Sequence, residues 1–300
     1  MTESIVINEV GLRDGLQSQP KHLTLYERER LANALLATGL RHFEVGSFVS
    51  PKAVPQMAGT GDLFARLQAP QDVHFSALIP NMKGYELARA AGLETVAVVV
   101  SATETMNQKN INMSLEDTLS VAQAVIQRGR DEGARVQAYL AVAFECPFEG
   151  VTPSSVVIDQ AKQLADWGAN EIVIADTIGA ANPAAVRGLM DTLVVALGSE
   201  RLACHFHDTR AMGLANVFAA IESGVRKFDS SVGGLGGCPF APGAKGNVAT
   251  EDVVMLCESI GYSTGVDMAA LLKAVDVVSE LVEAPQGGRA HYWLSNNVAA

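Results

Sequence analysis

Residues 95–100 read TVAVVV, and residues 171–177 read EIVIADT. Both runs are short, rich in Val and Ile and apolar on both faces, which is typical of strands that a parallel sheet buries on both sides. Similar runs recur along the whole chain. Together they predict eight strands, at residues 5–10, 42–48, 74–80, 95–100, 135–142, 171–177, 201–207 and 227–232.

Amphipathic stretches with helix-capping residues separate these strands. Thr24 precedes a helical pattern that ends at Gly39, and Ser114 with Asp117 three residues later forms a capping-box pattern. The strand starts mostly recur every ~25–40 residues, which is the length of one β-α unit. Eight such units predict an α/β fold, a (β/α)8 TIM barrel. The rival doubly wound sheet would usually show a G-x-G-x-x-G turn after its first strand, and EVGLRDGLQ (residues 9–17) is not one.

The chain is expected to form a single domain over residues 1–300, because no linker or break in composition interrupts it. A helical pattern at residues 267–284 follows the eighth unit, and we interpret it as a segment appended to the barrel. Residues 285–300 are expected to form a poorly ordered tail.

Composition limits the classes of function. The net charge of −11 argues against broad binding to nucleic acid or to anionic membranes, so an anionic ligand would need a local positive site. No stretch approaches the ~18 uninterrupted apolar residues that a membrane span needs. None of the four cysteines belongs to a C-x-x-C pair, and a reducing compartment, the cytoplasm, is the simplest expectation.

Polar side chains gather where the predicted strands end. In a TIM barrel the chemistry takes place at the carboxyl ends of the strands. The residues at or just beyond those ends are Arg13, Asp14, Glu44, Ser47, Asp176, Thr177, His205, His207 and Asn247.

The strongest local signal is His205-x-His207. Alternate residues of a strand point to the same face, so both imidazoles would face the barrel axis at its mouth. Asp14 and Asn247 could complete a site for a divalent metal with oxygen ligands, and such mixed ligands favour Mg or Mn. The alternative is a pair of histidines that are hydrogen-bonded within a polar layer of the core.

Arg13 directly precedes Asp14, and a fixed guanidinium beside a metal suits an enolate or carbonyl oxygen. The alternative is an arginine that pairs with Glu44 or Asp176, and both roles are compatible. The segment from Gly233 to Asn247 contains six glycines and two prolines around Cys238. It is interpreted as a mobile loop over the site, the alternative being a long surface connection.

Several of these motifs together resemble the 3-hydroxy-3-methylglutaryl-CoA lyase family. They are EVGLRDGLQ (9–17), FEVGSFVSPKAVPQM (43–57), CHFHDT (204–209), DSSVGGLGGCPFAPGAKGN (229–247) and ATEDV (249–253). The similarity extends from Ile7 to about Leu281, and the cysteine loop is its most specific part.

The resemblance implies a metal-dependent retro-Claisen cleavage of 3-hydroxy-3-methylglutaryl-CoA to acetyl-CoA and acetoacetate. It implies that Asp14, His205, His207 and Asn247 hold the metal, Mg or Mn. Arg13 would stabilise the enolate, Glu44 would orient Arg13, and Cys238 would close over the site and help to protonate that enolate. Asp14 and His205 are the candidate bases. The residues expected to bind the acyl-CoA are Arg13, Gln17, Ser47, Gln137, Tyr139, Asp176 and Thr177, with Lys21 and Lys52 for the CoA phosphates.

Two departures from the family pattern bear on the substrate. Gln137 stands where the family usually has arginine, and Val173 stands where it usually has serine. Because Gln137 is expected inside the barrel mouth, citramalyl-CoA or a longer-branched glutaryl-CoA is an alternative substrate. The rival functions are a condensing synthase of the same superfamily and a non-enzymatic metal-binding barrel. Besides the acyl-CoA, the expected partner is another copy of the chain, in a homo-oligomer.

Overall fold

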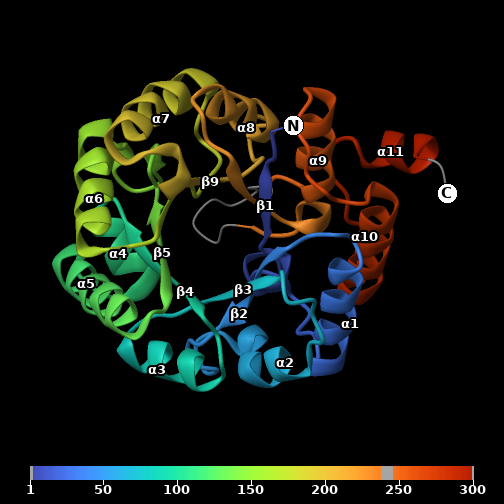
Figure 1. Cartoon of the computed structure of the whole chain (residues 1–300), viewed down its shortest axis with the longest axis horizontal. Helices are drawn as coiled ribbons and strands as arrows, with labels where there is room; N and C mark the ends of the chain where they lie inside the picture. Colours follow the sequence, from blue (N-terminus) through green and yellow to red (C-terminus); the bar gives the residue numbers. More distant parts are fainter. Residues whose placement is uncertain (1–2, 238–245, 299–300) are drawn as a thin grey trace.

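The computed structural model describes residues 3–237 and 246–298. Eight parallel strands form a closed barrel in the order β1-β10-β9-β8-β5-β4-β3-β2, which confirms the predicted TIM barrel (Figure 1). The strands are β1 (Val6–Glu9), β2 (His42–Ser47), β3 (His74–Leu78), β4 (Thr95–Ser101), β5 (Arg135–Ala141), β8 (Glu171–Asp176), β9 (Leu202–Phe206) and β10 (Lys227–Ser230). A small antiparallel pair, β6 (Glu145–Cys146) and β7 (Gly150–Val151), follows β5.

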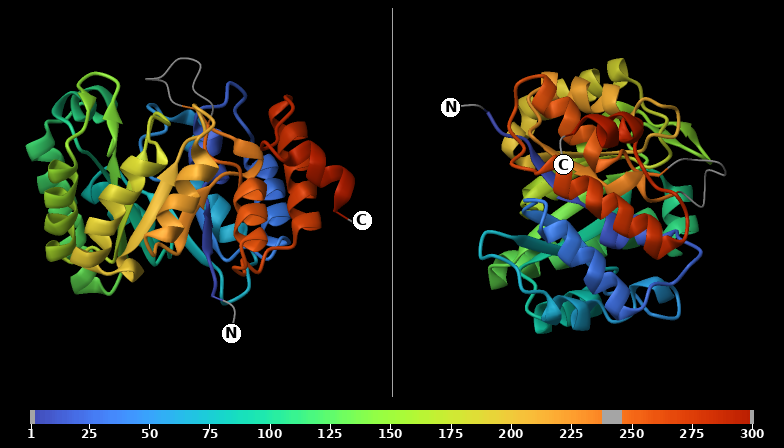
Figure 2. Two further views of the ribbon diagram at one scale, coloured as in Figure 1. Left: turned by 90° about the horizontal axis from the view of Figure 1, so that it is seen from above. Right: turned by 90° about the vertical axis from the view of Figure 1, so that its right-hand side faces the viewer.

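Helices surround the barrel and run alongside its strands (Figures 1 and 2). They are α1 (Leu25–Leu36), α2 (Thr60–Arg66), α3 (Met82–Ala90), α4 (Glu104–Ile111), α5 (Leu115–Glu132), α6 (Ser154–Trp167), α7 (Pro183–Leu197), α8 (Gly213–Glu222), α9 (Thr250–Ser259), α10 (Met268–Val282) and α11 (His291–Asn297). No helix within residues 3–237 or 246–298 is both long enough and apolar enough to cross a membrane.

The predicted helix starts have a local physical cause. The Thr24 side chain accepts a hydrogen bond from the Glu27 backbone N–H, and the Glu27 carboxylate accepts one from the Thr24 backbone N–H, so α1 begins with a complete capping box. The Ser114 hydroxyl accepts from the Asp117 backbone N–H and starts α5. Such caps satisfy N–H groups that have no partner within the helix.

Side chains fill the barrel interior in layers, as in other barrels of this size. Ala97, Tyr139, Val173 and Ala203 form one apolar cluster inside the strands, separate from the larger core between strands and helices. Val173, at the position where the family usually has serine, is fully buried in this cluster. Position 173 therefore presents an apolar side chain to the barrel interior and no hydroxyl.

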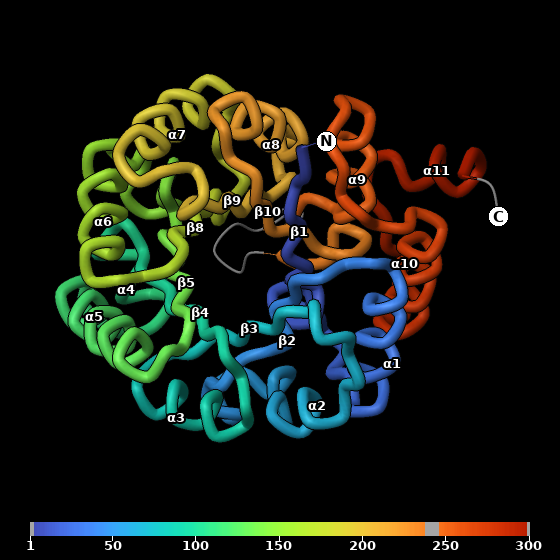
Figure 3. The backbone as a smooth tube through the Cα atoms, viewed as in Figure 1, coloured from blue at the N-terminus to red at the C-terminus, as the bar shows by residue number. Residues whose placement is uncertain are grey.

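The expectation of a poorly ordered tail from residue 285 is wrong for its described part. The backbone N–H of Gly288 donates to Glu251 Oε1 at 2.7 Å, and those of Arg289 and Ala290 donate to the two Asp252 carboxylate oxygens at 2.6 and 2.9 Å. Both acids are buried at the start of α9, so each needs donors that water does not supply. Because the tail provides these donors, it is held in place and continues into α11 (Figure 3).

The same C-terminal segment also reaches the carboxyl end of β9. Arg289 Nε donates to Asp208 Oδ2 at 2.6 Å, and Asp208 directly follows His207. The Gly287 backbone N–H donates to the Gly233 carbonyl oxygen at 3.0 Å, just beyond β10. Residues 287–290 therefore connect three parts of the chain that lie around the barrel mouth.

Gly288→Ala is expected to destabilise the fold by about 1–3 kcal/mol, a decrease of several °C in Tm. A Cβ at residue 288 would lie 2.5 Å from the Asp252 carboxylate, which two backbone N–H groups hold in place. The measurement is thermal unfolding by circular dichroism.

Gly188→Ala is the matched control. Gly188 is exposed on α7, and nothing lies within 4 Å of the added Cβ, so this change is expected to leave Tm unchanged or to raise it through better helix propensity. Equal Tm values for the two variants would contradict a held C-terminal segment.

Candidate active site

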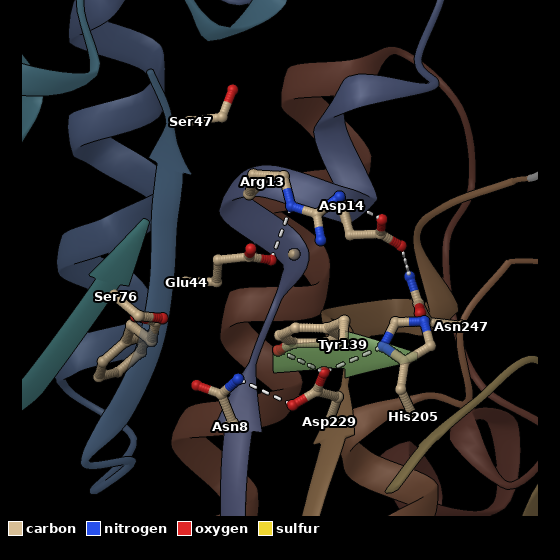
Figure 4. A network of polar contacts seen from close by, with 12 residues as sticks. Asn8, Arg13, Asp14, Glu44, Ser47, Ser76, Tyr139, His205, Asp229 and Asn247 are labelled. Atoms are coloured by element: carbon tan, nitrogen blue, oxygen red, sulfur yellow. Dashed lines mark hydrogen bonds and ion pairs between the residues drawn. The ribbon is translucent and has the colours of Figure 1, made fainter. Parts of the chain in front are cut away.

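The residues of the candidate site come from strands that are distant in sequence but meet at one end of the barrel. A single π-helical turn at Gly11–Gly15 follows β1 and carries Arg13 and Asp14. His205 lies on β9, and His207 just after it pairs with Asn247 in an isolated bridge. Figure 4 shows Arg13, Asp14, His205 and Asn247 close together above the ends of these strands.

Asp14, His205 and His207 form a group that could hold a metal ion. One ligand atom from each residue lies within 4.8 Å of the others. Asn247 Nδ2 donates to Asp14 Oδ2 at 2.8 Å and to the Leu235 carbonyl oxygen at 3.1 Å. Within the described parts of the chain, Asn247 Oδ1 and His207 Nδ1 are buried and have no hydrogen-bond partner. Buried polar atoms almost always have partners, so these donor atoms fit a cation at this position.

The protonation of His207 and the orientation of His205 agree with such a site. Burial, with the neighbouring His205, lowers the pKa of His207 to about 4, so its imidazole is neutral at pH 7 and keeps a lone pair. Burial also acts to lower the pKa of His205, but the hydrogen bond and charge of Asp229 outweigh it and raise that pKa. His205 Nδ1 faces Asp229 Oδ2 at 3.0 Å, which leaves Nε2 as its remaining ligand atom.

Asp229 was missed by the sequence analysis, as was Asn8. Besides His205, Asp229 accepts hydrogen bonds from the Tyr139 hydroxyl at 2.9 Å and from Asn8 Nδ2 at 2.8 Å (Figure 4). Its carboxylate therefore fixes His205 through donors on β1 and β5. The signal was present in the sequence, because an acid in the middle of a predicted buried strand needs buried partners.

Two acids hold the Arg13 guanidinium. Arg13 Nε donates to Glu44 Oε2 at 2.7 Å, and Nη1 donates to Asp14 Oδ1 at 2.6 Å. The expected pairing with Glu44 is therefore present, whereas Asp176 instead accepts from the backbone N–H groups of Ala180 and Ala181.

The charges of this group are coupled. Burial raises the pKa of Glu44 to about 7 although Arg13 opposes the shift. Burial also acts to raise the pKa of Asp14, but Arg13, the two histidines and the hydrogen bond from Asn247 together outweigh it and hold that pKa well below its usual range. A carboxylate that stays ionised beside a fixed cation is suited to bind a metal at neutral pH.

Only some of the other residues that were expected to bind the substrate line the same cavity. Gln17, Tyr139 and Thr177 line the same cavity of about 730 Å³ as Arg13, Asp14 and the two histidines. Ser47 is buried at the end of β2, apart from the cluster (Figure 4). Lys21 pairs with Glu283 at 2.8 Å, and Lys52 is exposed in the loop after β2. Cys238 lies outside the described residues.

The structure does not place Gln137 at the barrel mouth, and this expectation was wrong. Gln137 lines a separate cavity of about 270 Å³ with residues that begin their strands, such as His42, Thr95 and Lys227. Its Nε2 donates to Glu171 Oε1 at 2.7 Å. Gln137 shares the inward face of β5 with Tyr139 but lies two residues earlier, which is about 6.6 Å closer to the amino end of the barrel.

A buried glutamate positions the turn that carries Arg13 and Asp14. Glu9 Oε1 accepts hydrogen bonds from the backbone N–H groups of Gly11 at 2.8 Å and Val232 at 3.0 Å, and Oε2 accepts from the Thr250 hydroxyl at 2.6 Å. A Cβ on Gly11 would lie 2.6 Å from Glu9 Oε1, so the close approach requires glycine. Sequence reasoning missed this contact because Glu9 lies within a predicted apolar strand.

Comparison with known proteins gives a consistent similarity. The sequence matches the HMGL-like family over residues 4–278. It is 41% identical to the 3-hydroxy-3-isohexenylglutaryl-CoA/hydroxymethylglutaryl-CoA lyase of Pseudomonas aeruginosa over 97% of both chains. It is 40% identical to the (R)-citramalyl-CoA lyase of Chloroflexus aurantiacus over 94% of this chain and 92% of that one.

A solved structure supports the same grouping. The HMG-CoA lyase from Acinetobacter baumannii, in complex with coenzyme A and 3-methylmalate, superposes with a TM-score of 0.94. The two chains are 35% identical, and the match covers 99% of this chain and 97% of that one.

Glu9→Gln is expected to weaken the pH dependence of stability. Burial raises the pKa of Glu9 from 4.5 to about 7, so the folded state binds more protons than the unfolded state between these pH values. The stability that the protonated group contributes is present below pH 4.5 and is lost as the pH rises to about 7, by at most about 3 kcal/mol. Glutamine does not titrate and keeps the acceptor for the Gly11 and Val232 N–H groups.

The measurement is Tm between pH 4.5 and 7.5 for the wild type, Glu9→Gln and Glu86→Gln. Glu86 is exposed on α3 and controls for the loss of one surface carboxylate. A Glu9→Gln curve that runs parallel to the wild type would show that Glu9 does not titrate in this range.

Proposed function

The chain belongs to the HMGL-like family and is a carbon–carbon lyase, and we propose that it cleaves 3-hydroxy-3-methylglutaryl-CoA to acetyl-CoA and acetoacetate. The observation that carries the proposal is the Asp14–His205–His207 group beside the fixed guanidinium of Arg13 in one cavity. A retro-Claisen reaction requires a hydroxyl to lose its proton and a thioester to accept an electron pair. This cavity contains groups suited to both steps.

Asp14, His205 and His207, with Asn247 Oδ1 as the fourth ligand, would hold the divalent metal that we propose, Mg or Mn. When bound, such an ion lowers the pKa of a coordinated hydroxyl and supplies positive charge beside a substrate carboxylate. The matching protein groups are an ionised aspartate, a neutral imidazole and an amide oxygen without another partner.

In the proposed reaction the hydroxyl proton moves to Asp14 or His205, and the C2–C3 bond breaks. C3 becomes the ketone carbon of acetoacetate, and the electron pair forms the enolate of acetyl-CoA. Arg13 donates hydrogen bonds to the enolate oxygen, while Glu44 keeps the guanidinium in position. Protonation of the enolate, in which Cys238 takes part, completes acetyl-CoA.

The remaining residue roles are part of the same proposal. Gln17, Tyr139 and Thr177 line the cavity and would contact the acyl group, with Ser47 and Asp176 closer to the surrounding turns. Lys21 and Lys52 would bind the CoA phosphates, and for Lys21 this requires release from Glu283. We infer that the chain acts as a single barrel domain with residues 267–284 appended, as a homo-oligomer in the cytoplasm.

The expected outcome of a turnover assay is release of acetyl-CoA from 3-hydroxy-3-methylglutaryl-CoA when Mg or Mn is present. The assay compares this ester with citramalyl-CoA, because relatives of about equal similarity act on each. Cleavage of citramalyl-CoA alone would keep the reaction and change the substrate. No cleavage of either ester with metal present would contradict the lyase proposal.

His207→Ala is expected to abolish binding of Mn²⁺, and Asp229→Asn is expected to weaken it about 10- to 100-fold, the effect typical of groups that orient a metal ligand. Isothermal titration with Mn²⁺ measures both without relying on turnover. His42→Ala is the matched control, since His42 lies at the amino end of the barrel and should keep the wild-type affinity. Wild-type affinity in His207→Ala would exclude the proposed ligand set.

A further inference from the structure

The second cavity, about 270 Å³ in volume, lies at the amino end of the barrel, opposite the Asp14–His205–His207 group. The N-terminus of the chain lies at this end (Figure 2). Six of the residues that line the cavity are the first residues of their strands, namely His42, His74, Thr95, Arg135, Glu171 and Lys227. Side chains from distant parts of the sequence therefore meet at the amino end, as others do at the carboxyl end.

Arg135 differs from the other arginines at the starts of strands. Arg41, Arg201 and Arg226 directly precede β2, β9 and β10, and each donates to backbone carbonyl oxygens. Arg135 begins β5 and lines the cavity, and its guanidinium has no hydrogen bond or ion pair within residues 3–237 and 246–298. This cation is therefore available to a ligand.

Two imidazoles beside Arg135 are also without acceptors. The rings of His42 and His74 stack with their centroids 4.8 Å apart, and neither has a side-chain hydrogen bond to another residue of the described chain. Together with Arg135 they supply three side chains that can donate hydrogen bonds to one ligand.

Cations outnumber acids in this cavity. Burial lowers the pKa of His42 to about 4, and the charges of Lys227, His74 and Arg135 add to the shift. Glu171 is the only acid among the described lining residues, and it accepts hydrogen bonds from Lys227 at 2.5 Å and from Gln137 at 2.7 Å. The charges that oppose a proton on His42 attract an anion, although the chain as a whole carries a charge of −11.

One wall of the cavity offers an acceptor. Gln137 is only 5% exposed, and its Oε1 is buried without a hydrogen-bond partner in the described chain, while its Nε2 donates to Glu171. Exchanging the two amide atoms would place Oε1 against the Glu171 carboxylate, so the orientation is determined. Buried polar atoms almost always have partners. A ligand that carries an O–H group as well as negative charge therefore fits this wall.

We propose that the cavity at the amino end binds inorganic phosphate, with Arg135, His42 and His74 as donors to its oxygens and Gln137 Oε1 as the acceptor for its P–O–H group. At neutral pH phosphate carries both negative charge and an O–H group, whereas sulfate has no O–H group. The volume is below the about 300–1,000 Å³ of pockets for drug-sized ligands, which favours a small ion.

This site is independent of the proposed lyase reaction, because none of its four residues lines the large cavity at the barrel mouth. The experiment is isothermal titration of the full chain with inorganic phosphate at neutral pH and constant ionic strength. We expect one phosphate per chain with a Kd of about 1 mM or lower. Sulfate is expected to bind at least tenfold more weakly, because it leaves Gln137 Oε1 without a donor.

Arg135→Gln is expected to weaken phosphate binding at least tenfold, since it removes the charge and keeps a polar side chain. Arg130→Gln is the matched control, because Arg130 is exposed on α5 and does not line the cavity. His207→Ala changes the barrel mouth and is also expected to keep the wild-type Kd. Thermal unfolding gives a second measurement, in which phosphate raises the Tm of the wild type but not that of Arg135→Gln.

Four results would overturn the proposal. They are the absence of saturable binding up to about 10 mM phosphate, equal affinities for phosphate and sulfate, and a wild-type Kd in Arg135→Gln. The fourth is a loss of binding in His207→Ala, which would place the ion at the barrel mouth. Glycerol phosphate distinguishes a free ion from a phosphate ester, and tighter binding of this ester would overturn inorganic phosphate as the ligand.

Discussion

The carboxylate of Asp229 is the interaction on which the arrangement of the barrel mouth depends. It is almost completely buried on β10, where an unpaired charge would cost several kcal/mol. Asn8, Tyr139 and His205 satisfy it from β1, β5 and β9. One group therefore fixes the positions of three strands relative to a fourth and at the same time selects the nitrogen that His205 presents to the site. In this barrel, the requirement to compensate a buried acid and the requirement to orient a ligand are met by the same hydrogen bonds.

Other buried acids repeat this principle at the turns. Glu9 joins the turn after β1 to the turn after β10, and Glu251 accepts from the backbone N–H groups of Gly233 and Gly288. In each case burial raises the pKa to about 7. The partners that oppose this shift are hydrogen-bond donors, namely backbone N–H groups and the Thr250 hydroxyl, rather than cations. Arg13 and Glu44 are the exception, since a cation and an acid compensate each other there. The Arg13 guanidinium is therefore held at the end of the cavity that contains Asp14, His205 and His207.

The alternation of apolar strands and capped helices was sufficient to predict the barrel, because both patterns are local. The spacing of His205 and His207 also predicted their common face, and the rule for strand ends brought Asp14 and Asn247 to the same place. The position of a side chain along the barrel axis was not predictable in this way. Gln137 and Tyr139 share a face of β5, but only the register against β4 and β8 shows that Gln137 belongs to the opposite end. Glu9 and Asp229 were missed because most of their partners lie on other strands or turns, 24 to 241 residues away in sequence. The C-terminal segment was missed because it has no periodic pattern.

The contacts of residues 287–290 determine when, during synthesis, the barrel mouth can reach its final form. During synthesis the ribosome releases β1 first, and this strand keeps an open edge until β10 emerges to close the barrel. Even then, the acid pair at the start of α9 and the aspartate after His207 lack their last donors until residues 288–290 have emerged from the ribosome. Because domains fold as units, the barrel mouth reaches its final form only after this segment is available. A nascent chain that is stalled before residue 287 would therefore hold nearly all of the barrel without a finished site.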